Sequence, residues 1–238
     1  MLHPDSPMSL PLVMCDLDGT LIDSSRLYFE GVPAVVKRFL NRQIAPEALR
    51  PFWGRLARDF FAHFAAAAGA PSHCVDEMYA AFEDYYNREH NRLSRIYDTV
   101  PESIERLRTA GFKVGVVTTR PTSRSRPVLE LPLAHELDFI VWGDQVARPK
   151  PAPDGLEQAL EAHGLPRAGG IYVGDNANDI LAARASRYPV RAAAALWDAI
   201  DRPSLMAAGP DLAFENFGAF AQWVLTTWGQ DPDRNAAG

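Results

Sequence analysis

Five short apolar runs constrain the fold of this chain more than any other feature of its sequence. The runs are continuous rather than alternating in polarity, which is typical of parallel strands covered on both faces. They lie at residues 12–15, 112–118, 139–142, 171–174 and, more weakly, 190–194. Helical patterns separate several of them, so the chain is predicted to form a doubly wound, mostly parallel α/β sheet.

Three helices are predicted between these strands. The first begins at Thr99, which forms the pattern of a capping box with Glu102, and Gly111 closes it. The other two run over about 153–163, ending at Gly164, and over about 176–185. The second and third of these helices each follow an apolar run, as a strand–helix alternation requires.

One segment, at about 23–97, breaks this alternation. It contains almost no strand pattern, and its apolar residues recur at helical spacing, as in Phe60, Phe61 and Phe64. We therefore predict an all-helical cap domain over 23–97. It would be inserted into a core domain made of residues 10–22 and 98–228.

Composition narrows the classes of partner. The 238 residues carry a net charge of −6, which disfavours nucleic acid and anionic membranes as partners. The only two cysteines, Cys15 and Cys74, are too few for a disulfide framework, and the N-terminal residues lack the apolar core of a signal peptide. We expect a cytoplasmic protein, with monomer and homodimer both left open.

The strongest chemical pattern is Asp16-Leu-Asp-Gly-Thr, at the end of the first apolar run. In an open α/β sheet, ligands bind beyond the carboxyl ends of the strands. Asp16 would point into that crevice, and Asp18 would return to the same side two residues later. Gly19 suits the sharp bend that must follow.

Three further motifs follow strands and bring polar groups to the same edge. Thr118 ends the second run and can donate its hydroxyl to a phosphoryl oxygen. Lys150 stands between two prolines, which fix its direction. Asp175 and Asp179 are four residues apart, on one face of the helix that follows the fourth run.

Four carboxylates at one site would repel one another unless a cation joined them. A hard divalent ion with oxygen ligands resolves the conflict, and this chemistry favours Mg²⁺. Lysine adds a further positive charge for a phosphate dianion. Four histidines are scattered without the spacing of metal ligands, so structural roles are favoured for them. They are His63, His73, His90 and His163.

These motifs together resemble the haloacid dehalogenase-like superfamily, and within it the phosphoglycolate phosphatase-like branch with a helical cap. Asp-Leu-Asp-Gly-Thr-Leu-Ile-Asp at 16–23 is similar to the first family motif. Thr118 is similar to the second, Lys150 to the third, and Asp175 with Asp179 to the fourth. The resemblance extends from about residue 12 to residue 224.

The resemblance implies roles for four residues in phosphoryl transfer. Asp16 would be the nucleophile that forms an aspartyl-phosphate. Asp18 would act as general acid and then as general base, with a pKa well above its reference of roughly 3.9. Thr118 and Lys150 would hold the phosphoryl oxygens. Dehalogenase and phosphonatase members lack a carboxylate at the place of Asp18, so its presence favours phosphate esters.

The resemblance also implies the metal site. Mg²⁺ would be held by Asp16, the backbone carbonyl of Asp18, and Asp175, with Asp179 in support. The expected substrate is a small-molecule phosphate monoester, phosphoglycolate-like or a sugar phosphate.

The chain departs from its relatives where substrate enters. Thr119 stands where relatives commonly have Asn, and Arg120 where Lys is frequent. We expect both residues to bind substrate, with the leaving group undefined. Arg26, Arg55 and Arg58 are further candidates for a second polar group of the substrate. Each arginine taken alone, Arg120 included, is by default a solvated or ion-paired surface residue.

Three functions are consistent with the sequence. The first is a Mg²⁺-dependent phosphatase acting through an aspartyl-phosphate. The second is a phosphomutase, in which the same intermediate passes its phosphoryl group to another hydroxyl. The third is a binding or regulatory protein that keeps the fold without turnover, which the intact acidic residues disfavour.

Overall fold

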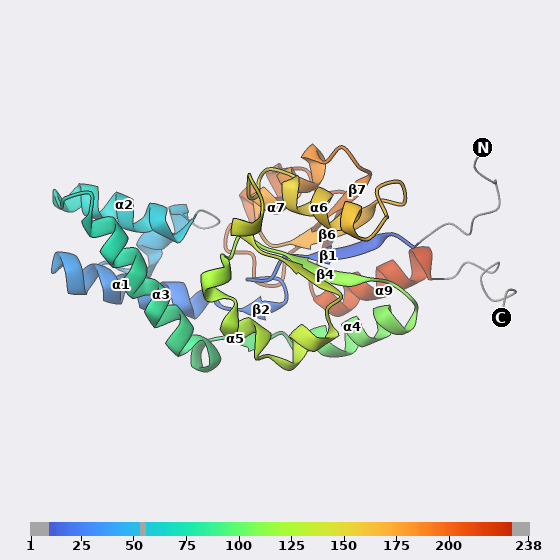
Figure 1. Cartoon of the computed structure of the whole chain (residues 1–238), viewed down its shortest axis with the longest axis horizontal. Coiled ribbons are helices and arrows are strands. Elements are labelled where there is room, and N and C mark those ends of the chain that lie inside the picture. The colour runs from blue at the N-terminus through green and yellow to red at the C-terminus, as the bar shows by residue number, and fades with distance from the viewer. Residues whose placement is uncertain (1–9, 53–55, 230–238) are drawn as a thin grey trace, which may run out of the picture.

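The computed structural model describes residues 10–52 and 56–229 (Figure 1). Within them, six strands form one sheet in the order β5-β4-β1-β6-β7-β8, and every neighbouring pair is parallel. The predicted doubly wound α/β fold is therefore confirmed. The strands of this sheet are β1 (Leu12–Cys15), β4 (Val114–Val117), β5 (Phe139–Val141), β6 (Gly170–Gly174), β7 (Val190–Ala195) and β8 (Leu212–Phe214).

Helices bury both faces of the sheet, as the continuous apolar runs require. Val13 and Cys15 of β1 pack on the side of α4 (Val100–Thr109) and α9 (Phe217–Trp228). Leu12 and Met14 face the opposite side, with α6 (Asp154–Ala162), α7 (Ala177–Ala185) and α8 (Arg202–Ala207). Figure 1 shows α4 and α9 across the sheet from α6 and α7.

A separate helical unit lies beside the carboxyl ends of the strands (Figure 1). It contains α1 (Ser25–Leu40), the 3₁₀ segment η1 (Pro46–Phe52), α2 (Ala57–Ala68) and α3 (Cys74–Leu93). These elements share a hydrophobic core of their own, in which Phe60, Phe61, Phe82 and Tyr86 are almost completely buried. The helical periodicity of this segment therefore reflects packing between its own helices.

Short elements connect the two parts. β2 (Ile22–Asp23) and β3 (Arg95–Ile96) form a two-stranded antiparallel ribbon between the core and the helical unit. The loops beyond the sheet contain η2 (Thr122–Arg124), α5 (Arg126–Leu129), η3 (Pro132–Glu136) and η4 (Gly143–Gln145). Because η2 directly follows β4, it lies at the edge where ligands are expected.

Two details differ from the sequence predictions. β2, β3 and β8 were not anticipated, since runs of two or three residues carry too little periodicity to detect. The capping box at Thr99 is wrong: its hydroxyl makes no cap on α4 and instead accepts from the N–H of Gly218 at 3.2 Å. Across residues 10–52 and 56–229, no helix combines the length and apolarity needed to cross a membrane.

Candidate active site

The first strand ends in a tight turn that packs against β6. The N–H of Asp16 still donates to the carbonyl of Val173 at 2.8 Å, so Asp16 lies where the pairing of β1 ends. Gly19 follows with φ +80°, in the left-handed region that favours glycine. A Cβ at Gly19 would lie 2.4 Å from Oδ2 of Asp175. Only a residue without a side chain fits this close approach.

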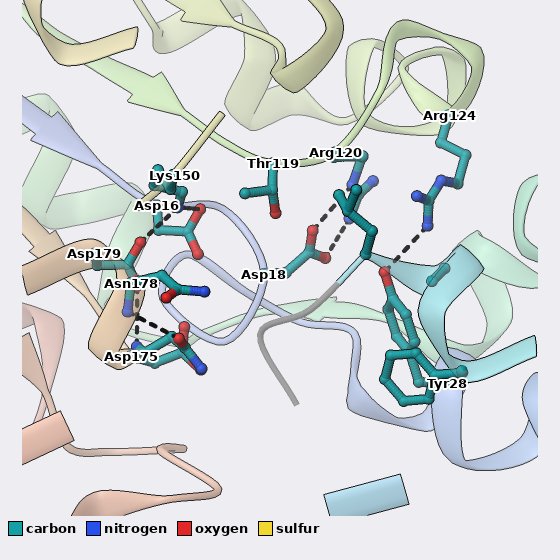
Figure 2. A pocket seen from close by; sticks show the side chains of 14 residues that line it. Asp16, Asp18, Tyr28, Thr119, Arg120, Arg124, Lys150, Asp175, Asn178 and Asp179 are labelled. Carbon is teal, nitrogen blue, oxygen red and sulfur yellow. Dashed lines mark hydrogen bonds and ion pairs between the residues drawn. The ribbon is translucent and has the colours of Figure 1, made fainter. Parts of the chain in front are cut away.

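Three carboxylates gather beyond the ends of β1 and β6 (Figure 2). Oxygens of Asp16, Asp175 and Asp179 lie within 4.8 Å of one another, and all three residues are buried. Asn176 caps α7 by accepting from the N–H of Asn178 at 3.0 Å, and its own N–H donates to Asp179 at 2.9 Å. Asp179 therefore belongs both to the start of the helix and to the acidic cluster.

Lys150 is the cation of this cluster. Its Nζ lies 2.8 Å from Oδ1 of Asp16 and 2.5 Å from Oδ1 of Asp179, and donates to the Tyr172 hydroxyl at 2.7 Å. The side chain is 5% exposed. Burial alone would lower the pKa of Lys150, but Asp16 and Asp179 raise it above its ordinary value. The ammonium therefore stays charged beside Asp16.

The acidic cluster suits a hard divalent cation. Burial, together with the charge of Asp179, raises the pKa of both Asp16 and Asp175, against the lowering by Lys150. Oδ1 of Asp16 pairs with Lys150 at 2.8 Å and has no further hydrogen-bond partner among the described residues. Oxygen donors with surplus negative charge are the ligands that Mg²⁺ prefers, so these residues fit the predicted ion.

Asp18 lines the same cleft as Asp16, with its carboxylate turned toward Arg120 (Figure 2). Arg120 donates to both its oxygens, from Nε to Oδ2 at 3.1 Å and from Nη2 to Oδ1. The hydroxyls of Ser24 and Tyr86 also donate to Oδ1. Burial alone would raise the pKa of Asp18, but Arg120 lowers it to about 2. The expectation of a raised pKa is therefore wrong for this arrangement of the site, because the guanidinium holds the carboxylate ionised.

Arg120 is buried rather than on the surface, with 1% of its side chain exposed. Its guanidinium carbon lies 5.0 Å from the centre of the Tyr86 ring, and Nη1 lies 3.2 Å from Nε2 of His90. Burial and the charge of Arg120 lower the pKa of His90 to about 4, so the imidazole is neutral at pH 7 and accepts at Nε2. Asp18, Tyr86 and His90 thus hold the guanidinium from three directions.

The two threonines after β4 lie at different depths. Thr118 is buried, its N–H donates to the Val141 carbonyl at 3.0 Å, and its hydroxyl oxygen accepts from the N–H of Arg120 at 3.1 Å. The hydroxyl proton can still be donated to a ligand. Thr119 lines the cleft itself.

A second arginine lines the cleft beyond Asp18 (Figure 2). Arg124 ends η2, its side chain is 5% exposed, and its Nη1 donates to the Tyr28 hydroxyl at 3.1 Å. Its guanidinium carbon lies 4.9 Å from the centre of the Tyr86 ring and 5.8 Å from that of Phe82. The cleft between the sheet and the helical unit encloses about 690 Å³, part of which is open solvent.

The remaining arginine candidates lie away from this cleft or outside the described residues. Arg26 pairs with Glu30 and Arg58 with Asp76, and both arginines are more than half exposed. These contacts agree with the default of an ion-paired surface residue. Arg55 falls outside the described residues.

Sequence reasoning missed three residues that shape the site. Tyr172, which donates to the Val117 carbonyl at 2.8 Å, was detectable as a polar-tipped side chain in an aliphatic strand, where its hydroxyl needs a partner. Arg124 was detectable as a cation in the loop that follows β4. His90 had no sequence signal, because its contact with Arg120 joins residues 30 positions apart.

A family comparison agrees with this geometry. A model described as haloacid dehalogenase-like hydrolase matches residues 13–193, which is well over half of the chain. The chain belongs to the haloacid dehalogenase-like hydrolases. The predicted resemblance is thereby confirmed.

Curated relatives of this hydrolase carry phosphatase names. Pyrophosphatase PpaX of Bacillus cereus strain G9842 is 30% identical over 209 residues, covering 87% of this chain and 93% of that protein. PpaX of Bacillus mycoides strain KBAB4 is 29% identical over 209 residues, covering 87% and 94%. Together with the family match, these relatives confirm the prediction of a phosphatase of this family.

Solved structures share the fold of this hydrolase. A predicted phosphoglycolate phosphatase from Haemophilus somnus has a TM-score of 0.81 and 23% identity, covering 90% of this chain and 97% of that one. A structure named as a β-phosphoglucomutase from Thermotoga maritima has a TM-score of 0.70 and 20% identity, covering 92% and 98%. At these identities the likeness concerns the fold.

Proposed function

We propose that this hydrolase cleaves a small-molecule phosphate monoester with Mg²⁺, through an aspartyl-phosphate on Asp16. The observation that carries the proposal is the buried cluster in which Asp16, Asp175 and Asp179 lie within 4.8 Å and Lys150 contacts Asp16. The family match supports the reaction class, and the names of the PpaX relatives support a compact phosphate substrate.

Asp16 is the proposed nucleophile. A carboxylate oxygen of Asp16 attacks phosphorus while the bond from phosphorus to the leaving oxygen breaks. Lys150, fixed by Asp179 and the Tyr172 hydroxyl, then stands beside the transferred group and stabilises its charge. The hydroxyl of Thr118 is the proposed donor to a phosphoryl oxygen, and Thr119 and Arg120 stand on the substrate side.

Asp18 is the proposed general acid and base. It would protonate the leaving oxygen and later remove a proton from the water that attacks the aspartyl-phosphate. In the structure it is an ionised carboxylate bound to Arg120. The base step can use this form directly, whereas the acid step requires Asp18 to leave the arginine and first take up a proton from solvent.

The proposed metal ligands are Asp16, Asp175 and the backbone carbonyl of Asp18, with Asp179 in support. When bound there, Mg²⁺ neutralises charge on the carboxylates and on the phosphoryl oxygens. The fit rests on the surplus negative charge of three buried carboxylates that share one lysine.

The helical unit is proposed to act as a cap over 23–97 that excludes water during turnover. Tyr28 and Phe60 from this unit line the cleft together with the acidic cluster. Addition of a substrate analogue with Mg²⁺ should therefore reduce protease cleavage of 23–97.

The free thiols Cys15 and Cys74 accord with the proposed cytoplasmic location.

The experiment is phosphate release from a panel of phosphate esters, with Mg²⁺ or with EDTA. Asp16→Asn removes the attacking charge at nearly constant size, so release should fall by at least about a thousandfold. Acid quenching during turnover should trap phosphoprotein in the wild type and not in this variant. Isomerised sugar phosphate in place of free phosphate would indicate the mutase instead.

Asp84→Asn is the matched control, since Asp84 is exposed on α3. It should leave phosphate release unchanged. Near-full activity of Asp16→Asn would show that the nucleophile is wrongly assigned. Activity that persists in EDTA would exclude the proposed dependence on Mg²⁺.

A further inference from the structure

Arg124 is a buried cation that the proposed transfer of the phosphoryl group does not use. It comes from η2 of the core, yet it packs against side chains of the helical unit, between the Tyr28 hydroxyl and the ring of Tyr86. Its side chain is 5% exposed and it lines the same cleft as Asp16. A guanidinium is protonated at any physiological pH, so this position always carries a positive charge.

The positive charge of Arg124 is only partly compensated. Its nearest carboxylate is that of Glu83, whose Oε1 lies 3.9 Å from Nε, too far for a hydrogen bond. The same oxygen already accepts from the Ser123 hydroxyl at 2.7 Å. Among residues 10–52 and 56–229, no group accepts a hydrogen bond from Nε of Arg124, although this atom is buried. A buried donor of a charged group without an acceptor is costly unless a ligand supplies one.

Arg120, the second arginine that lines the cleft among the described residues, is engaged in a different way. Arg120 has the Asp18 carboxylate on two of its nitrogens and His90 on the third. Both guanidiniums lie about 5 Å from the centre of the Tyr86 ring, at 5.0 and 4.9 Å, so two like charges share one aromatic side chain. An anion beside Arg124 would offset their repulsion and satisfy the unpaired donor.

We propose that Arg124, oriented by the hydroxyl of Tyr28, binds an anionic group on the leaving-group half of the substrate. The substrates are then phosphate esters or anhydrides whose leaving group carries a carboxylate or a second phosphate. This inference rests on the proposed phosphatase function. It places the transferred phosphoryl group at Asp16 and Lys150, and the second anion across the cleft beyond Asp18.

The test compares matched substrates that differ in this second anion. Phosphoglycolate is paired with 2-hydroxyethyl phosphate, in which a neutral hydroxymethyl group replaces the carboxylate. Pyrophosphate is paired with 4-nitrophenyl phosphate, whose leaving group has a similar pKa but no second phosphate, and the two pairs distinguish a carboxylate from a phosphate as the bound group. The measured quantity is the ratio of kcat/KM for the charged member to that for the neutral member, with Mg²⁺ present.

In the wild type, kcat/KM for the charged member of at least one pair should be tenfold or more above that for the neutral member. Arg124→Met removes the charge at similar length, so that ratio should fall by about 10- to 100-fold, the value of a lost hydrogen bond to a charged group. Arg124→Lys should keep part of the preference. Arg126→Met is the control, because Arg126 is 87% exposed two residues along the chain and its removal should leave the ratio unchanged.

A wild-type ratio near one for both pairs overturns the inference, as does an unchanged ratio in Arg124→Met. If Arg124→Met does not fold, the inference is tested by the kcat/KM ratios of the wild type and of Arg124→Lys. A higher ratio in Arg124→Lys than in the wild type would contradict the role of Arg124. If phosphate is released equally well from charged and neutral members, this inference is wrong but the proposed phosphatase function stands. No release from any ester or from pyrophosphate would contradict the proposed function, and the inference with it.

Discussion

His90 shows how a buried neutral group can organise charged neighbours. It lies in α3 with its ring 5.8 Å from that of Tyr86, and its Nε2 faces Nη1 of Arg120 at 3.2 Å. Nδ1 lies 3.1 Å from the hydroxyl of Ser94, which fixes the ring from its other side. A protonated imidazole would place a second positive charge against the guanidinium. The contact therefore depends on the neutral form.

This dependence predicts how stability changes with pH. Burial and Arg120 lower the pKa of His90 from 6.5 to about 4. The unfolded chain therefore binds a proton below about pH 6.5, whereas the folded protein does so only below about pH 4. The free energy of unfolding should fall as pH decreases through this window, by about 1–2 kcal/mol between pH 7 and pH 5 from this residue alone.

Urea unfolding at pH 7 and pH 5 measures the effect. His90→Gln keeps an acceptor near Arg120 but does not titrate, so its loss of stability between the two pH values should be smaller than that of the wild type by about this amount. His73→Gln, which changes an exposed histidine, is the control and should behave as the wild type does. Equal losses in wild type and His90→Gln would contradict the assignment.

At the scale of elements, the turn after β1 positions the site. It brings Asp16 and Asp18 into one cleft, Asp16 beside Lys150 and Asp18 beside Arg120, and its Gly19 packs against Asp175 between β6 and α7. The N–H of Gly19 donates to the Ile22 carbonyl at 2.8 Å, which ties the turn to β2 and so to the ribbon between the core and the helical unit. The turn therefore links the acidic cluster to the helical unit.

Gly19→Ala should separate backbone strain from displacement of Asp175. An alanine at φ +80° is strained by about 1–3 kcal/mol, and its Cβ would also lie 2.4 Å from Oδ2 of Asp175. Gly69→Ala is the matched control, because Gly69 has φ +69° at the end of α2 with no atom within 4 Å of the new Cβ among the described residues. Urea unfolding and phosphate release measure the two effects.

Both variants should lose stability, since both place a side chain in the left-handed region. Only Gly19→Ala should also lose phosphate release, because it moves a proposed metal ligand. Activity of Gly19→Ala equal to that of Gly69→Ala would show that the position of Asp175 does not matter for turnover.

At the scale of the whole molecule, charge is divided along the cleft. Three buried carboxylates beyond β1 and β6 share one lysine, Lys150, at one part of the cleft. At another part, two buried arginines of the loop after β4 stand near Asp18. The molecule as a whole is acidic, with a net charge of −6. Because three carboxylates share one lysine, we expect the cluster to oppose folding unless a divalent cation binds there.

Mg²⁺ should accordingly stabilise the folded protein. A ligand at 100 times its dissociation constant adds about 2.7 kcal/mol to the free energy of unfolding. The unfolding temperature should therefore rise when Mg²⁺ is added and fall back when EDTA removes it. Asp175→Asn removes one of the three charges. In EDTA it should be more stable than the wild type, and its response to Mg²⁺ should be smaller. Asp84→Asn is again the control, and a full Mg²⁺ response in Asp175→Asn would exclude Asp175 as a ligand.

Parts of this architecture are readable from local sequence. Continuous apolar runs predict β1, β4, β5, β6 and β7 because each strand is buried on both faces, and its residues show this without reference to any partner. The strand β8 was not predicted because it has only three residues, all of them partly or fully exposed. The cap of α4 was wrong because Thr99 is used by α9, an element more than a hundred residues away.

The sequence by itself determined the fold class and the arrival of Asp16, Lys150, Asp175 and Asp179 at one edge, because strand ends in a parallel sheet share that edge by geometry. Only the tertiary structure decided which side chains surround Asp18 and the two arginines of the cleft, and how they are charged. There Arg120 holds Asp18 ionised, neutral His90 backs Arg120, and Arg124 stands incompletely paired. These states depend on distances between side chains of separate elements, and neither residue type nor spacing encodes such distances.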